Sequence, residues 1–168
     1  MKSRLLPVLI LASAALATLT WAAGAPSSAQ IAAQIELQRF ERDVLSIETA
    51  DGRRQRFEIE LAVTGAQRAQ GLMYRRSLAE DGGMLFLYGG AGMLSMWMKN
   101  TPIPLDMMFI APDGRIVDIA ERTVPYSLET VASRFAASAV LEVNGGTVAR
   151  LGIRPGDRVL HRAFGSGS

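Results

Sequence analysis

The chain has 168 residues, with 18 Lys and Arg, 16 Asp and Glu, one His and no Cys. This length fits one domain that buries a core without disulfides, since domains of about 100–150 residues are common. The absence of Cys excludes disulfide scaffolds, zinc ribbons and thiol nucleophiles. The single histidine, His161, excludes a metal centre with several His ligands and weakens any Ser–His–Asp hypothesis.

The first residues have the pattern of a secretory signal peptide. Lys2 and Arg4 precede an apolar run from Leu5 to Ala23, and small residues follow. A basic start, an apolar stretch and small residues near the cleavage point are typical of such leaders. We expect residues 1–29 to be cleaved and the protein to be exported, to the periplasm or out of the cell. The alternative is an uncleaved anchor, because about 19 apolar residues approach the length that spans a membrane.

Loss of this leader changes the charge balance. Without Lys2 and Arg4 the 18 basic residues become 16, which equals the number of acidic residues. Nucleic-acid binding depends on an excess of positive charge on one face of a protein. We therefore expect no nucleic-acid partner, and a membrane contact only through an uncleaved amino-terminal segment. The oligomeric state is left open.

A hairpin is the first element predicted after the leader. Residues 30–42 are expected to form a tether, with a short helix in it at Ile31–Leu37. Residues 44–49 and 57–61 then alternate between apolar and polar side chains, which is typical of half-buried strands. Asp51-Gly52 between them is a strong signal for a tight turn. The pattern predicts a β-hairpin with one apolar face.

Two short helices are also predicted. Thr64 and Gln67 have the spacing of a capping box at the start of a helix, and Gly71 is expected to end that helix. A second helix is predicted to end at Leu151, with Asn144 as its cap.

The remaining strands are predicted from short apolar runs separated by Gly and Pro turns. These runs cover residues 84–88, 93–98, 105–110, 116–120, 139–143 and 158–161. Residues 89–92 are expected to be a flexible connection, residues 123–138 a long loop, and residues 163–168 a flexible tail. About eight short strands with one or two short helices indicate one all-β domain over residues 43–162.

One segment between two predicted strands combines side chains suited to ligand binding. Lys99 is the only lysine after the leader, and it offers a compact charge with a tunable pKa. In a binding pocket, Trp97 would stack on a ligand while Lys99 and Asn100 donate hydrogen bonds. Asp106 would orient Lys99 or accept from a ligand hydroxyl. The structural alternative is that Asn100 and Asp106 bond the backbone of a turn and that Trp97 belongs to the core.

A set of short motifs resembles the family known as domain of unknown function 192, over residues 43–162. The motifs are Gly71-Leu72-Met73-Tyr74-Arg75, Gly83-Met84-Leu85-Phe86, Trp97-Met98-Lys99-Asn100-Thr101, Ile103-Pro104-Leu105-Asp106, Asp113-Gly114-Arg115-Ile116, Val140-Leu141-Glu142-Val143, Gly152-Ile153 and Gly156-Asp157. The resemblance implies a compact all-β domain that is often exported in bacteria, with no established activity, cofactor or catalytic residues. Together with the strand pattern, it predicts a single-domain sandwich or partly closed barrel of jelly-roll character.

The leading functional hypothesis is a binding module for a small polar ligand such as a sugar. An aromatic ring, an amide and a carboxylate in one pocket suit a carbohydrate. Arg75 and Glu142 are candidate additions from neighbouring strands to the group formed by Trp97, Lys99, Asn100 and Asp106.

Two other functional classes stay open, and no catalytic residue is assigned. In a hydrolase, two carboxylates among Asp106, Glu142 and Asp157 would act as general acid and base. An envelope protein that contacts other proteins, or a copper(I) binder, would use the methionine-rich stretch, because thioether sulfur is a soft ligand. Its methionines are Met84, Met93, Met96, Met98, Met107 and Met108. No cofactor and no other metal site are predicted.

Overall fold

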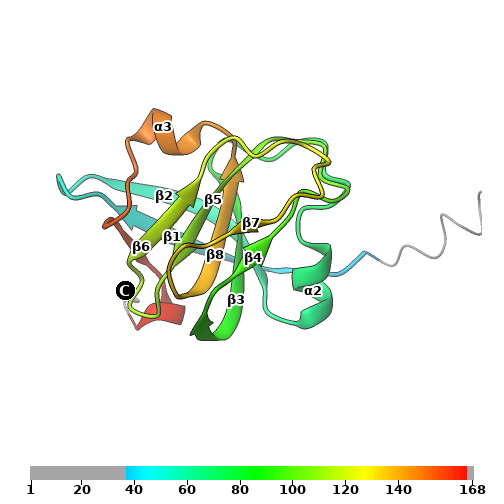
Figure 1. The fold of residues 1–168 in the computed structure, drawn as a ribbon. Helices are drawn as coiled ribbons and strands as arrows, with labels where there is room; N and C mark the ends of the chain where they lie inside the picture. The colour runs from blue at the N-terminus through cyan, green and yellow to red at the C-terminus, as the bar shows by residue number, and fades with distance from the viewer. Residues whose placement is uncertain (1–36, 166–168) are drawn as a thin grey trace, which may run out of the picture. The chain divides into compact units, whose positions relative to one another are not determined.

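The predicted amino-terminal hairpin is present in the computed structural model, which describes residues 37–165 (Figure 1). Strands β1 (Glu41–Glu48) and β2 (Arg54–Ala62) pair antiparallel around the turn at Asp51-Gly52. The predicted signal peptide lies outside the described residues, as do the tether and its helix up to residue 36. The first strand begins at Glu41, two residues before residue 43.

Helix α2 (Gly65–Gln70) has the predicted caps. Thr64 Oγ1 accepts from the Gln67 backbone N–H at 3.1 Å, and Gln67 Oε1 accepts from the Thr64 N–H at 3.0 Å. At the other end, the Gly71 N–H donates to the Gln67 carbonyl at 2.8 Å. Both expectations from local sequence are confirmed, because a capping box satisfies the free N–H groups of the first turn.

Seven strands form one sheet in the order β6-β5-β8-β3-β2-β1-β9. Beyond the hairpin, its members are β3 (Gly82–Gly92), β5 (Leu105–Ile110), β6 (Ile116–Ala120), β8 (Ala137–Asn144) and β9 (Arg158–Leu160). Only the pairing of β2 with β3 is parallel among the neighbours in this sheet. The all-β prediction is confirmed, and the bounds of β5 and β6 match the expected strands.

The sheet nearly closes into a barrel, since β9 lies against the start of β6. The Val159 N–H donates to the Gly114 carbonyl at 2.8 Å, and the Ile116 N–H donates to the Asp157 carbonyl at 2.9 Å. We call this contact the barrel seam. Of the two predicted architectures, the partly closed barrel describes the sheet.

Gly114→Ala is expected to open the barrel seam and to destabilise the fold more than Gly52→Ala. Both glycines have left-handed φ, 84° and 81°, so each alanine costs about 1–2 kcal/mol in backbone strain. A Cβ atom at Gly114 would lie 2.6 Å from the Val159 carbonyl oxygen, whereas one at Gly52 would meet nothing within 4 Å. We expect Gly114→Ala to cost about 2 kcal/mol more in urea unfolding. Equal losses in the two variants would contradict the predicted clash.

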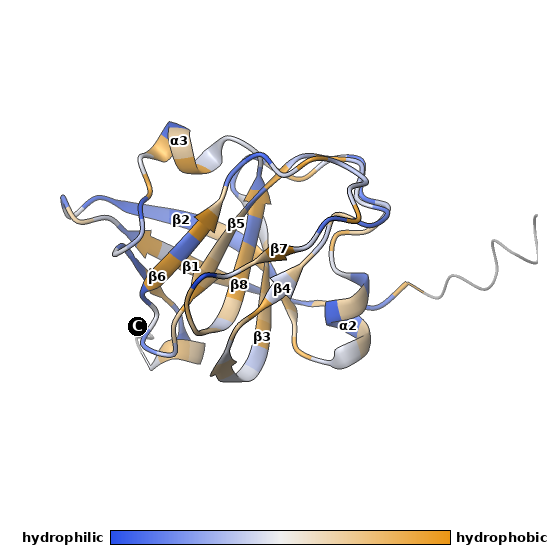
Figure 2. Cartoon of the chain, viewed as in Figure 1, coloured by the Kyte–Doolittle hydropathy of each residue, from blue (hydrophilic) through white to orange (hydrophobic). Residues whose placement is uncertain are grey.

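Two hydrophobic cores lie on opposite sides of the sheet. The barrel core includes Leu45, Phe57 and Leu141. The outer core lies between the other face of β3, β8 and β5 and a cover that includes β4 (Ser95–Met96) and β7 (Val131–Ala132). In Figure 2, β5 and β8 are mostly hydrophobic, whereas β2 is largely hydrophilic. Strands β5 and β8 therefore contribute buried side chains to both cores.

The cover differs from the sequence prediction. The strand expected over residues 93–98 is reduced to β4, which pairs only with β7 inside the expected loop 123–138. The expected flexible connection at residues 89–92 belongs to β3, with an irregular register between Leu87 and Gly92.

The carboxy-terminal elements also differ in detail. Helix α3 (Thr147–Leu151) has Gly146 as its N-cap, while the Asn144 side chain donates to the Ala79 carbonyl at 2.8 Å. The prediction that Asn144 caps this helix is therefore wrong. A 3-10 helix, η1 (Arg162–Phe164), follows β9 and places Phe164 in the barrel core. This helix extends two residues beyond residue 162.

Candidate functional site

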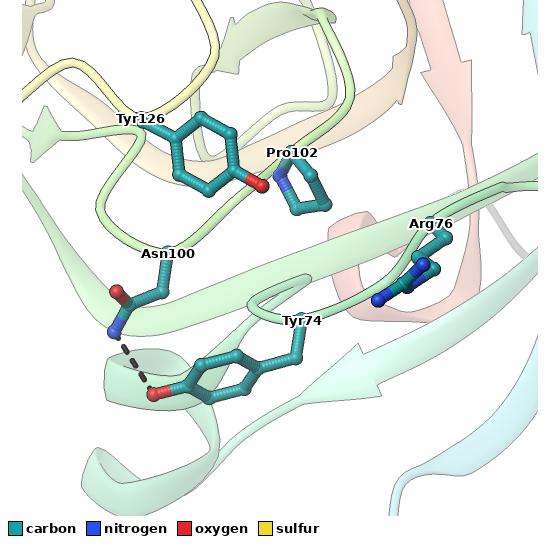
Figure 3. Close-up of a pocket in the computed structure, with 5 residues that line it drawn as sticks. All are labelled: Tyr74, Arg76, Asn100, Pro102 and Tyr126. Atoms are coloured by element: carbon teal, nitrogen blue, oxygen red, sulfur yellow. Dashed lines mark hydrogen bonds between the residues drawn. The ribbon is translucent and has the colours of Figure 1, made fainter.

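Three loops at one side of the outer core surround a cavity of about 400 Å³. The first loop follows α2, the second joins β4 to β5, and the third joins β6 to β7. The cavity, called the three-loop pocket, is lined by Tyr74, Arg76, Asn100, Pro102 and Tyr126. Figure 3 shows Tyr126 and Pro102 on one side of it and Tyr74 and Arg76 on the other. The pocket is thus assembled from residues distant in the sequence.

Backbone hydrogen bonds tie the three loops to one another. The Tyr74 N–H donates to the Asn100 carbonyl at 2.8 Å, which joins the first loop to the second. The Tyr126 N–H donates to the Thr101 carbonyl at 3.1 Å, which joins the third loop to the second. These bonds fix the backbone of three of the lining residues.

The same three residues have unusual backbone conformations. Tyr74, Asn100 and Tyr126 have φ of 66°, 55° and 61°, in the left-handed region. Among the non-glycine residues that the structure describes, only Arg122 shares this property. A left-handed conformation is uncommon outside glycine and costs about 1–2 kcal/mol for a residue with a Cβ atom. Three of the four strained positions in residues 37–165 therefore line one cavity.

Some polar groups of the three-loop pocket make no hydrogen bond within residues 37–165. Asn100 Nδ2 donates to Tyr74 Oη at 2.9 Å (Figure 3). Within the described part of the chain, Tyr126 Oη and Asn100 Oδ1 make no hydrogen bond. Tyr74 is 50 % and Tyr126 63 % exposed. The pocket therefore offers two aromatic rings, a hydroxyl and an amide oxygen to a ligand.

The charge in the pocket comes from Arg76. It is the only charged residue among the five that line the cavity. Within residues 37–165, no carboxylate lies within 4.0 Å of its guanidinium. The pocket thus carries a positive charge that no neighbouring acidic group in this range neutralises.

A comparison with known families decides the relationship suggested by the motifs. The profile of the family DUF192, described as an uncharacterised ACR, matches residues 46–161. The chain belongs to the DUF192 family. No curated protein matches it.

Two solved structures resemble this DUF192 domain. One is a protein from Sinorhizobium meliloti 1021, named as a proposed transcription regulator, with 48 % identity and a TM-score of 0.74. That match covers 76 % of this chain and 98 % of the other. A protein of unknown function from Novosphingobium aromaticivorans DSM 12444 has 38 % identity and a TM-score of 0.68, covering 81 % of this chain and 98 % of the other.

The six site residues predicted from the sequence are not brought together in the DUF192 domain. Asn100 is the only one of them that lines the three-loop pocket. Trp97 and Lys99 belong to the same loop, with Lys99 Nζ 5.1 Å from the centroid of the Trp97 ring. Trp97 is 49 % exposed, so the structural alternative that placed it in the core is wrong.

Asp106 has a structural role. Its carboxylate is fully buried and accepts from the backbone N–H groups of Arg122, Gly146 and Val148 at 2.8–3.0 Å. The prediction that Asp106 orients Lys99 is wrong, because all its hydrogen bonds go to the backbone at the start of α3 and to the third loop. The structural alternative given for Asp106 holds.

The other two predicted residues lie outside the pocket. Arg75 forms an ion pair with Glu60 and lines a separate cavity of about 310 Å³. Glu142 is buried on β8, directly opposite Met84 on β3 and Met107 on β5. Burial raises the pKa of Glu142 to about 8.

The carboxylates considered for a hydrolase do not meet. The Asp106 carboxylate accepts from backbone N–H groups, and Glu142 is buried on β8. Asp157 accepts from the backbone N–H groups of Ala50 and Arg154 at 2.9 and 2.8 Å. None of the three lines the three-loop pocket or the cavity beside Arg75. His161 is buried, with Nε2 3.1 Å from Asp43 Oδ2.

The methionines considered for copper are mostly core residues. Four of them, Met84, Met96, Met98 and Met107, pack in the outer core, whereas Met108 belongs to the barrel core. Met93 is exposed. In residues 37–165, no three His, Asp or Glu side chains are placed to hold a metal ion together. Nor does a helix in that range have the length and apolar character needed to cross a membrane.

Four of the lining residues had no signal in the sequence that marked them as site residues. Tyr74 and Arg76 lie in or beside the first family motif, but nothing in their spacing marks them as partners of Asn100. Tyr126 lies in the expected long loop 123–138, and Pro102 lies between two predicted strands. Their proximity depends on the backbone bonds between loops, which no local pattern encodes.

Proposed function

We propose that this DUF192 domain binds a small polar ligand, such as a sugar, in the three-loop pocket. The observation that carries the proposal is the set of three strained residues around one cavity, Tyr74, Asn100 and Tyr126. Strained backbone is retained where the surrounding structure enforces it, and it concentrates at sites of binding and catalysis. The bonds between loops hold the cavity open for its ligand, and such preorganisation favours affinity.

The size and lining of the cavity support a ring-shaped polar ligand. A volume of about 400 Å³ lies within the range of small-molecule sites. The faces of Tyr74 and Tyr126 can stack on a ring, while Tyr126 Oη and Asn100 Oδ1 can bond its hydroxyl groups. Trp97 and Lys99 lie on the same loop as Asn100 but outside the lining of the cavity, and Lys99 packs on the exposed Trp97 ring.

We further propose that the domain acts outside the cytoplasm. The support is the amino-terminal pattern, in which Lys2 and Arg4 precede an apolar run and small residues. A binding module in the periplasm would meet nutrients or envelope polymers, for which a sugar-sized pocket is suited.

Replacing Tyr126 with Ala is expected to remove ligand binding and leave the fold intact. Thermal unfolding of the purified domain would be followed with a panel of neutral and acidic mono- and disaccharides. A ligand at about 100 times its Kd stabilises a protein by about 2.7 kcal/mol, which shifts the Tm by several degrees. Tyr126→Ala should reduce this shift strongly, because it deletes one stacking face.

The matched control is Phe135→Ala, which deletes another exposed aromatic ring that does not line the pocket. It should keep the full shift. Stabilisation by a sugar that survives Tyr126→Ala, or that is lost equally in Phe135→Ala, would place binding elsewhere and contradict the proposal.

A further inference from the structure

We infer that the ligand of the three-loop pocket is a sugar ring that carries a carboxylate, a member of the hexuronic acid class; this inference rests on the function proposed above. The pocket combines two aromatic faces, groups that bond hydroxyls, and one cation. A neutral sugar would use the aromatic faces and the hydrogen-bonding groups, but it would leave the cation without an anionic partner.

Within residues 37–165, Arg76 has no ion-pair partner, whereas its neighbour Arg75 has one. Arg75 pairs with Glu60, so its charge is compensated within the domain. For Arg76, no acidic side chain of residues 37–165 lies within ion-pair distance, and no carboxylate lines the cavity. A cation in a pocket without an acidic partner attracts an anionic ligand.

Contacts of the two preceding residues hold the backbone next to Arg76 in place at the wall of the pocket. The Tyr74 N–H bonds the Asn100 carbonyl at 2.8 Å, and the Arg75 side chain is held by Glu60. Arg76 follows both anchored residues directly in the chain. Its side chain therefore starts from a defined position at the cavity wall, opposite Pro102 (Figure 3).

The number of cations favours a carboxylate over a phosphate. One guanidinium forms two parallel hydrogen bonds with one carboxylate, and the two groups match in charge and geometry. A phosphate at neutral pH carries more charge and more acceptor oxygens, and sites for it gather several donors. The three-loop pocket supplies one Arg and no other charged lining residue. A hexuronic acid places one carboxylate on a ring with several hydroxyls, which fits this set.

The test compares acidic and neutral sugars by calorimetry at pH 7. The probes are galacturonic and glucuronic acid, galactose and glucose as their neutral counterparts, and galactose 6-phosphate. The wild-type protein should bind the uronic acid at least about tenfold more tightly than the neutral sugar, since an ionic hydrogen-bonded pair is worth roughly that factor. Raising the salt concentration should weaken binding of the acid alone.

Variants of Arg76 identify the group responsible. Arg76→Gln should reduce affinity for the uronic acid about tenfold, toward the level of the neutral sugar, and reduce affinity for the neutral sugar by a much smaller factor. Arg154→Gln removes the same charge from an exposed turn that does not line the three-loop pocket, and it should change neither affinity. Because the Arg76 side chain is exposed, both variants should unfold at the wild-type temperature without sugar.

Each of the other possible results contradicts one specific claim about the ligand or the pocket. Equal affinity for acid and neutral sugar, both sensitive to Tyr126→Ala, would overturn the inference and keep the pocket as a sugar site. Tighter binding of galactose 6-phosphate than of either uronic acid would overturn the choice of carboxylate. Equal losses in Arg76→Gln and Arg154→Gln would show that net charge, rather than this pocket, recognises the acid. Absence of binding by every sugar would overturn the inference and a sugar as ligand together.

Discussion

Asp106→Asn should lower the free energy of unfolding by about 3–5 kcal/mol. The buried carboxylate accepts from the N–H groups of Gly146, Val148 and Arg122, and thereby fixes the start of α3 and the third loop. The amide of Asn keeps one acceptor oxygen and turns an NH2 group toward these donors. Each buried donor left without a partner costs about 1–3 kcal/mol.

Urea unfolding at pH 7 would measure the effect, with Asp113→Asn as a matched control. Asp113 accepts from one backbone N–H, that of Arg115 at 3.0 Å, in an exposed turn, so its loss should stay below about 1 kcal/mol. Comparable losses in the two variants would show that the buried network of Asp106 contributes little.

Glu142→Gln should stabilise the domain at pH 8, on the order of 4 kcal/mol, and have little effect at pH 4. Burial raises the pKa of Glu142 to about 8 in the folded state, compared with an ordinary value of 4.5. At a pH between 4.5 and about 8, Glu142 is deprotonated in the unfolded chain but still protonated in the folded protein. The folded form therefore loses about 1.4 kcal/mol of stability per pH unit, and this loss ends above the folded-state pKa.

The measurement is the difference in unfolding free energy between wild type and Glu142→Gln at several pH values from 4 to 9. This difference isolates Glu142 from carboxylates such as Asp118, whose pKa is lowered by its hydrogen bonds with Arg134. Glu129→Gln, at an exposed position, serves as the control and should give a pH profile parallel to wild type. A parallel profile for Glu142→Gln would mean that the Glu142 carboxyl is ionised or hydrated in the fold.

Elements whose signals are local could be predicted from the sequence. Asp51-Gly52 marked the first turn, and the pair Thr64 and Gln67 marked the start of α2. Strand β5 has apolar side chains on both faces, and its bounds were found because Pro residues and a turn flank it. In each case, neighbouring residues alone determine the backbone.

Features that depend on distant contacts could not be predicted. Glu142 was a site candidate from a neighbouring strand, but it is buried on β8, opposite Met84 and Met107 of the outer core. Asp106 and Asn100 were predicted to belong to one pocket, yet Asp106 bonds the start of α3 and Asn100 lines the three-loop pocket. The direction of each side chain followed from the packing of loops that are far apart in the sequence.

The barrel seam has a consequence for the order of folding. Strand β9 pairs with β1, where Ser46 lies opposite Leu160, and its other edge makes the seam with the segment at Gly114. Contacts between such distant positions form slowly, because a long loop must close before they contribute. A nascent chain that ends before Asp157 leaves β1 and β6 with open edges, so the barrel is completed only when the last strand is available.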